Sequence, residues 1–89
     1  TGALVLADAG LLKNRPATTY WGATDLLKSI DGTIDVRYED RFVDDGDIVT
    51  AAGVSAGIDM ALYLVKRLHS VERAREVRRE IQYDPEPPV

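Results

Sequence analysis

The sequence predicts an α/β protein, because segments with helical periodicity and segments with strand periodicity alternate along its 89 residues. A second observation concerns residues 48–52 (Ile-Val-Thr-Ala-Ala), which form an apolar run without alternation. Such a run is typical of a strand that is covered on both faces and has a neighbour on each side. The chain offers few other strands, so we expect it to carry only part of a sheet.

The chain opens on an apolar segment that predicts a first helix. Apolar residues recur at helical spacing through residues 1–12, and the Asn-Arg-Pro sequence at 14–16 ends the pattern. The segment has no polar run-in and no initiating Met. We therefore expect Thr1 to be an internal residue of a larger protein.

The next part of the chain predicts a short strand, a helix and a second strand. Residues 17–19 are β-prone, and the apolar stripe within 23–30 predicts an amphipathic helix that an Asp-Gly turn follows. Residues 33–38 alternate apolar and polar side chains, as a half-buried strand does.

A hairpin and two further helices follow. Residues 41–43 predict a strand, and the Asp-Asp-Gly-Asp sequence at 44–47 predicts a tight turn into the apolar run described above. Residues 54–68 carry the clearest helical stripe of the chain. Ser70 opens another helix, which ends before an extended, proline-rich tail at 83–89.

Composition excludes several classes of protein. The chain has no Cys and one His, so neither a disulfide framework nor a structural zinc site is available to it. Its net charge of −4 argues against nucleic-acid binding, which requires a positive face. Charged residues interrupt the apolar stretches, so no segment is expected to span a membrane, and no secretory signal opens the chain. We therefore expect a cytoplasmic protein that uses no metal and no cofactor.

Two sets of polar residues could carry chemistry, and each has a simpler interpretation. His69 lies at the expected C-terminal end of the helix at 54–68, where a cation suits the helix dipole, so we interpret it as a surface or capping residue. Asp44, Asp45 and Asp47 cluster without the spacing of a calcium loop. We interpret them as turn residues rather than metal ligands.

The segment from Gly53 to Gly57 has the G-x-S-x-G spacing of a nucleophile elbow, and it follows a strand and opens a helix. No acid and His follow in a usable order, so we favour Ser55 as a helix N-cap over Ser55 as a nucleophile. Asp59, in the first turns of the expected helix, is interpreted as a buried partner of the helix dipole or of a hydrogen bond rather than as an acid catalyst. The Thr-Thr-Tyr-Trp sequence at 18–21 lies at an expected strand end, where sites form in parallel sheets. An aromatic plug under the following helix is an equally good interpretation of it.

Taken together, four stretches of the chain resemble the DJ-1/PfpI family, which has the class I glutamine-amidotransferase-like fold. They are residues 1–12, 15–21, 43–46 and, most specific, 50–59 (Thr-Ala-Ala-Gly-Val-Ser-Ala-Gly-Ile-Asp). The resemblance covers nearly the whole chain and is nearest to the isonitrile-hydratase-like branch, whose tail is similar to residues 81–88.

This resemblance implies a three-layer, flavodoxin-like α/β sandwich, of which residues 1–89 form the C-terminal half of a single domain. The implied parts are a helix at 1–12 that follows a nucleophile elbow, a helix at 53–68 that packs near the site, and the extended tail at 83–89.

The resemblance also implies an active site. In the family a reactive Cys lies at a strained strand-to-helix elbow, and the next residues read Thr-Gly-Ala, as they do from Thr1 here. Thr1 would then contribute its backbone N–H, and its hydroxyl beside it, to the site, while the helix that starts at Gly2 lowers the pKa of the Cys. A companion N-terminal half would carry the Cys, the acidic residue that tunes it and the oxyanion loop.

Tyr20 departs from the family pattern, since many members have His at this position. An unperturbed phenol has a pKa of about 10 and cannot act as a base at neutral pH, which puts a Cys–His mechanism in doubt. A Cys thiolate poised by a carboxylate and a helix dipole remains compatible with the sequence. The resemblance implies that Thr1, Gly2, Tyr20 and Val54 contact the substrate, with Val54 shaping the pocket.

The implied function is that of a Cys-dependent hydrolase or hydratase acting on a small-molecule electrophile such as an isonitrile, expected as a homodimer. A redox- or stress-sensing protein, in which the Cys is oxidised without turnover, is one alternative. The ligand-sensing domain of an AraC-type transcriptional regulator is another. The chain alone lacks the nucleophile, so we expect activity only from the full protein.

Overall fold

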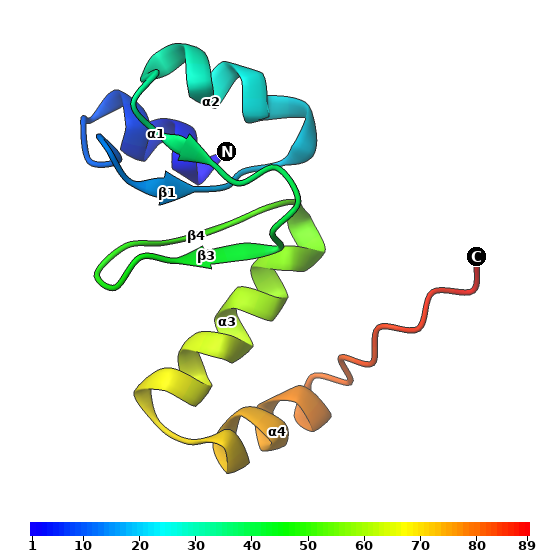
Figure 1. Cartoon of the computed structure of the whole chain (residues 1–89). Helices are drawn as coiled ribbons and strands as arrows, with labels where there is room; N and C mark the ends of the chain where they lie inside the picture. The colour runs from blue at the N-terminus through cyan, green and yellow to red at the C-terminus, as the bar shows by residue number, and fades with distance from the viewer.

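The computed structural model describes residues 1–89 and has the predicted alternation of helices and strands. The strands lie between the pair of helices α1 and α2 and the long helix α3 (Figure 1). No helix is both long and apolar enough to cross a membrane. The elements, in chain order, are α1 (Gly2–Asp8), β1 (Pro16–Ala17), the 3-10 helix η1 (Trp21–Ala23), α2 (Thr24–Ile30), β2 (Asp35–Val36), β3 (Phe42–Asp44), β4 (Val49–Ala51), α3 (Val54–Leu68) and α4 (Val71–Glu80).

The strands form two pairs rather than one continuous sheet. β1 pairs with β2 in parallel, with Ala17 opposite Val36, and β3 pairs with β4 in antiparallel register, with Val43 opposite Thr50. A buried hydrogen bond joins the two pairs, since the Thr18 N–H donates to the Thr50 hydroxyl oxygen over 3.0 Å. A side chain therefore makes the connection that a continuous ladder would make with backbone groups.

The predicted strand at 48–52 is shorter than expected and has fewer strand neighbours. It is reduced to β4, and Thr50 is its only fully buried residue. Within this chain β4 has a strand neighbour only on its β3 side. Helices approach β4 from both layers, since it contacts α1 as well as α3, but the second strand neighbour that the apolar run predicts is not found among residues 1–89.

A small apolar core lies between α1, α2 and the β1–β2 pair. Leu12, Leu27 and Ile34 are completely buried in it. The predicted alternation holds for Ile34 and Val36, which point inward, but Tyr38 is exposed and β2 ends at Val36. The expected strand over residues 33–38 is thus correct only in its middle.

The first helix ends earlier than the sequence predicts. The expectation of a helix over residues 1–12 was wrong, because α1 ends four residues before Leu12. The reason is Gly10, whose φ of +78° lies in the left-handed region. The Gly10 N–H donates to the Ala7 carbonyl and the Leu11 N–H to the Leu6 carbonyl, each over 3.0 Å. This pair of bonds is the Schellman arrangement that closes a helix at a glycine.

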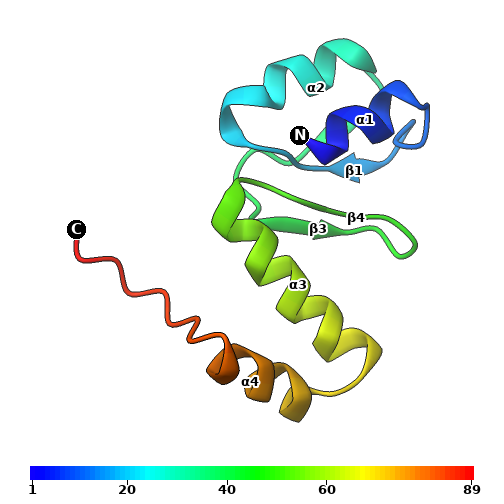
Figure 2. The ribbon, with the colours of Figure 1, turned by 180° about the vertical axis from the view of Figure 1, so that it is seen from behind.

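The two C-terminal helices match their predicted positions. The hydroxyl oxygen of Ser70 accepts the Arg73 N–H over 3.0 Å and caps α4, and His69 forms the C-cap of α3. Ala56 is the only buried residue of α3, and α4 has none. Seen from behind, α3 starts beside the strands, whereas α4 and the tail lie away from them, beyond the far end of α3 (Figure 2). These helices consequently leave much of their apolar surface open, with Leu68 78% exposed.

The surface of the chain is large for its mass. It measures 6145 Å², whereas a compact monomer of 9.8 kDa exposes about 5,200 Å². The radius of gyration is 14.1 Å, against about 12 Å for a compact domain of this length. Val5, Trp21 and Val54 are 70%, 76% and 94% exposed. The chain thus has the extended shape and open apolar faces of an incomplete α/β layer.

Substituting Gly10→Ala should destabilise the protein by about 1–2 kcal/mol. An added Cβ at Gly10 meets no atom within 4 Å, so the cost is that of the left-handed backbone alone. Gly32→Ala is the matched control, since Gly32 also has no neighbour within 4 Å and lies outside the left-handed region. The control should change the free energy of unfolding by less than about 0.5 kcal/mol in urea denaturation. Equal effects of the two changes would contradict the role of Gly10.

Candidate functional site

A cleft of about 590 Å³ opens where β1 and β4 end and α3 begins. Its volume lies within the range of small-molecule sites, roughly 300–1,000 Å³. Its walls come from the segment after β1, the loop between β2 and β3, and the start of α3. The lining residues are Thr19, Tyr20, Trp21, Tyr38, Glu39, Asp40, Arg41, Ala52, Gly53, Val54, Ser55, Ala56 and Ile58.

The structure places most of the Thr-Thr-Tyr-Trp segment in this cleft. Thr19, Tyr20 and Trp21 line it, whereas Thr18 is buried and its hydroxyl donates to the Arg37 carbonyl over 2.7 Å. Trp21 is 76% exposed, so the alternative of an aromatic plug under α2 was wrong. The aromatic rings of Tyr20 and Trp21 instead stand together at the cleft, with centroids 5.3 Å apart.

Tyr20 and Val54, which were predicted to contact the substrate, lie in the same cleft. The Tyr20 ring is set between two glycines: a Cβ added at Gly22 would lie 2.7 Å from Tyr20 Cε2, and one added at Gly53 would lie 3.6 Å from Cδ1. Close backbone approach therefore holds the ring in place. Val54 extends into open space at 94% exposure.

Thr1 and Gly2 are not among the residues that line the cleft. Both are exposed at the N-terminal end of α1. The Thr1 carbonyl accepts the Leu4 N–H over 3.0 Å, but its hydroxyl does not cap the helix.

Thr19 is a cleft residue that sequence reasoning did not single out by itself. Its side chain is 1% exposed, and its hydroxyl oxygen is the one buried side-chain polar atom without a hydrogen-bond partner. Leaving a buried hydroxyl unpaired costs about 1–3 kcal/mol. No sequence pattern could reveal this, because the β-prone run reads the same whether or not the hydroxyl finds a partner.

Ser55 has a different role from the predicted one. The N-cap of α3 is Gly53, and Ser55 is the second residue of the helix. The assignment of Ser55 as the N-cap was therefore wrong. Its hydroxyl oxygen accepts a hydrogen bond from Arg41 Nη2 over 3.1 Å. The Ser55 hydroxyl therefore faces Arg41 rather than a base that could activate it as a nucleophile.

Asp59 is a hydrogen-bonding partner, as predicted, but its side chain is 26% exposed rather than buried, and its partners come from distant segments. The Tyr83 hydroxyl donates to Asp59 Oδ1 over 2.5 Å, and Arg41 Nε donates to the other carboxylate oxygen. We call Arg41, Asp59 and Tyr83 the tail latch, because they join the loop before β3, the helix α3 and the C-terminal tail.

The tail latch perturbs the protonation of its members. Burial raises the pKa of Asp59, but the hydrogen bonds from Tyr83 and Arg41 outweigh burial and hold that pKa below its usual value. The hydrogen bond to Asp59 raises the pKa of Tyr83. At neutral pH the carboxylate is therefore ionised and the phenol protonated, which is the pairing the hydrogen bond needs. An ionised Asp59 does not serve as an acid catalyst.

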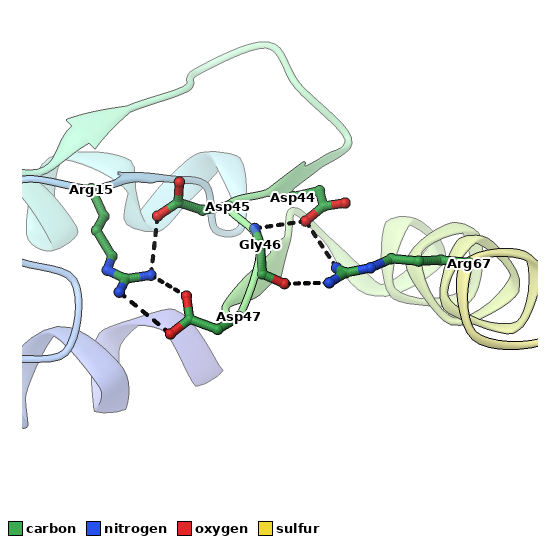
Figure 3. Close-up of polar contacts among 6 residues, drawn as sticks. All are labelled: Arg15, Asp44, Asp45, Gly46, Asp47 and Arg67. Carbon is green, nitrogen blue, oxygen red and sulfur yellow. Dashed lines mark hydrogen bonds and ion pairs between the residues drawn. The ribbon is translucent and has the colours of Figure 1, made fainter.

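The aspartates of the hairpin turn face arginines rather than one another (Figure 3). On one side Arg15 Nη1 lies 3.2 Å from Asp45 Oδ2 and 2.5 Å from Asp47 Oδ1. On the other side Arg67 Nη1 lies 3.0 Å from Asp44 Oδ1. No three carboxylates of the structure converge on a common point. This geometry supports the interpretation of the three aspartates as turn residues.

The chain is similar to known proteins along nearly its whole length. The model of the DJ-1/PfpI family matches residues 1–67. The isonitrile hydratase of Pseudomonas putida is 47% identical over 88 residues, which is 99% of this chain and 37% of that protein. The HTH-type transcriptional regulator CdhR of Pseudomonas aeruginosa is 40% identical over 77 residues, 86% of this chain and 23% of the regulator.

A solved structure agrees with the fold. The crystal structure of a ThiJ/PfpI family protein from Pseudomonas syringae superposes with a TM-score of 0.86 at 40% identity, over 99% of this chain and 35% of that one. The predicted class I glutamine-amidotransferase-like α/β fold is thereby confirmed. The chain spans 37% of the hydratase, 35% of this solved chain and 23% of the regulator.

Tyr63→Phe should raise the pKa of Asp44 more than Arg67→Gln does. The Tyr63 hydroxyl donates to Asp44 and is the largest cause of the lowered pKa, ahead of the Gly46 N–H and Arg67. The pKa of Asp44 is lower in the folded state than in the unfolded state. The interaction therefore stabilises the fold at pH values above the unfolded-state pKa of about 3.9. This stabilisation is lost as the pH falls through the folded-state pKa of Asp44. Carboxyl NMR titration of the two variants measures this order, and the reverse order would contradict it.

Proposed function

This chain belongs to the DJ-1/PfpI family, and we propose that it forms part of a cysteine-dependent enzyme that adds water to a small electrophile such as an isonitrile. The observation that carries the proposal is the 47% identity to an isonitrile hydratase over 88 residues. The match to the regulator CdhR is weaker and shorter, at 40% over 77 residues. Because the chain spans 37% of the hydratase, the activity is proposed for the full protein.

We place residues 1–89 in the C-terminal half of a single domain, with a companion N-terminal half that supplies the rest of the sheet. Three features support this placement: the unpaired edge of β4, the exposed apolar residues of α1 and α3, and the unpartnered hydroxyl of Thr19. A companion strand beside β4 would provide both backbone pairing and apolar cover. The homodimer and the cytoplasmic location remain predictions.

The companion half would carry the nucleophilic Cys directly before Thr1. In that position Thr1 presents its backbone N–H to the reacting atoms, with Gly2 leaving room for the substrate. Tyr20 and Val54 would form the apolar wall of the same site. A thiolate there needs a carboxylate or an oriented dipole to lower its pKa, since Tyr20 is not a base at neutral pH.

The chemistry is a redox-neutral addition. Water adds across the terminal carbon and the nitrogen of R–N≡C, so that the carbon gains the oxygen and one proton while the nitrogen gains the other proton. The product is the formamide R–NH–CHO. A thiolate assists by attacking the isonitrile carbon first and leaving when water has replaced it, so no cofactor is required.

The full protein should convert an organic isonitrile to the corresponding formamide over many turnovers, as followed by chromatography of the product. Replacing the proposed nucleophilic Cys with Ser should abolish turnover while the fold is kept. Stoichiometric oxidation of the Cys without formamide would favour the sensor instead. Sequence-specific DNA binding by the full protein, without turnover, would favour the regulator.

Tyr20→Phe should keep most of the activity, within roughly threefold, because the ring that packs on Gly22 and Gly53 is preserved and the phenol is not used as a base. The pH profile of kcat should also be unchanged. Tyr20→Ala, which removes the ring, is the comparison and should lower kcat/KM substantially. A loss of about a hundredfold or more in Tyr20→Phe would contradict the proposed role.

A further inference from the structure

A second hollow lies directly beside the cleft and is walled by the C-terminal tail. Its volume is about 520 Å³. It shares Arg41 and Ser55 with the cleft, so the two hollows meet at these side chains. The remaining walls are Asp59 and the tail residues 83–87. We call this space the outer hollow.

The tail latch holds the tail in this place. Besides its bond to Asp59, the Tyr83 hydroxyl lies 3.4 Å from the Ser55 carbonyl oxygen, to which it can also donate. Both acceptors belong to the first turns of α3, where the cleft ends. A single phenol therefore fixes the position of a tail that otherwise bonds back to its own helix through Arg78.

The rim of the combined space is acidic. Five carboxylates and one guanidinium line the two hollows: Glu39, Asp40, Asp59, Asp84 and Glu86, with Arg41. Arg41 is already paired with Asp59. Two cations outside the lining also lie close, since Arg37 is 3.9 Å from Asp40 and Arg78 is 3.5 Å from Asp84.

These two contacts leave Glu39 and Glu86 without a cationic partner, so carboxylates outnumber guanidiniums around the two hollows. Arg75, Arg78 and Arg79 line a further hollow that shares Tyr83 and Asp84 with the outer hollow. Charges of one sign around a hollow change the local concentration of charged small molecules, and salt screens the effect over about 8 Å at physiological ionic strength.

We propose that the outer hollow is a specificity subsite that receives the distal part of the substrate and selects against anionic groups there. The proposal rests on the proposed function in placing the reactive Cys at the inner cleft. Neutral and cationic small electrophiles then reach the Cys, whereas those that carry a carboxylate meet the acidic rim. Tyr83 is a positioning residue, because it keeps Glu86 at the entrance without touching the reacting atoms.

The test compares alkylation of the reactive Cys in the full protein by two reagents of similar size. Iodoacetamide is neutral and iodoacetate is anionic; with each, the thiolate sulfur forms a bond to the CH₂ carbon and iodide leaves. Rates are read by mass spectrometry of the Cys peptide at low and high salt, relative to a free thiol. The wild type should react with iodoacetate at least roughly threefold more slowly than the free-thiol ratio predicts, and added salt should reduce this difference.

Glu86→Gln should raise the iodoacetate rate and leave the iodoacetamide rate unchanged. Glu72→Gln is the matched control, because it removes the same charge from α4 at a position that lines neither hollow. Tyr83→Phe should act like Glu86→Gln, since it releases the tail while keeping the ring. Effects of equal size in Glu86→Gln and Glu72→Gln would assign the discrimination to net charge and overturn the proposal.

The outcomes separate this proposal from the proposed function. Discrimination between the reagents without turnover of any isonitrile would leave the subsite in place and refute the hydratase. Turnover together with a wild-type rate ratio equal to that of the free thiol would refute the subsite alone. A Cys that neither reagent reaches would also overturn the proposal, because the outer hollow must open onto it.

Discussion

The position of the β3–β4 hairpin is the constraint on which the rest of the structure depends. At its turn, Arg15 and Arg67 bind the aspartates from opposite sides and so join the hairpin to β1 and to α3. At its open end, the Ala52 N–H donates to the Arg41 carbonyl over 2.8 Å. This bond brings the loop before β3 beside the start of α3. The cleft, the tail latch and the outer hollow all lie around this end.

The energetics indicate that residues 1–89 are not stable on their own. The ion pairs of the chain are exposed or only partly buried, and solvent-exposed pairs contribute about 0–1 kcal/mol each. Its core contains only three completely buried large apolar residues: Leu12, Leu27 and Ile34. Neither contribution offsets the conformational entropy of a chain of this length. We therefore propose that the exposed faces of α1 and α3 and the unpaired edge of β4 supply the remaining stabilisation, through contacts with the companion half.

Sequence patterns correctly predicted those parts of the fold that depend on residues close together in the chain. The Asp-Gly turn gave the hairpin, and Ser70 gave the start of α4, because turn and cap preferences act within a few residues. The early end of α1 was missed, since Gly10 within an apolar repeat can be read as a tolerated interruption. The tail latch could not be predicted, because Asp59 and Tyr83 meet across 24 residues through a fold that periodicity does not specify. Likewise, Ser is a residue type that favours N-cap positions, but the hydroxyl of Ser55 bonds to Arg41 instead. This contact depends on the tertiary fold.

The most direct test of this account is the urea unfolding of residues 1–89 alone, compared with the same segment in the full protein. If segments outside these residues complete the core, the isolated chain should show no cooperative transition in circular dichroism and little amide protection in hydrogen exchange. Addition of the companion N-terminal half should restore both. A monomeric 9.8 kDa chain that unfolds cooperatively on its own, with an m-value of about 1 kcal/mol/M in urea, would contradict the account.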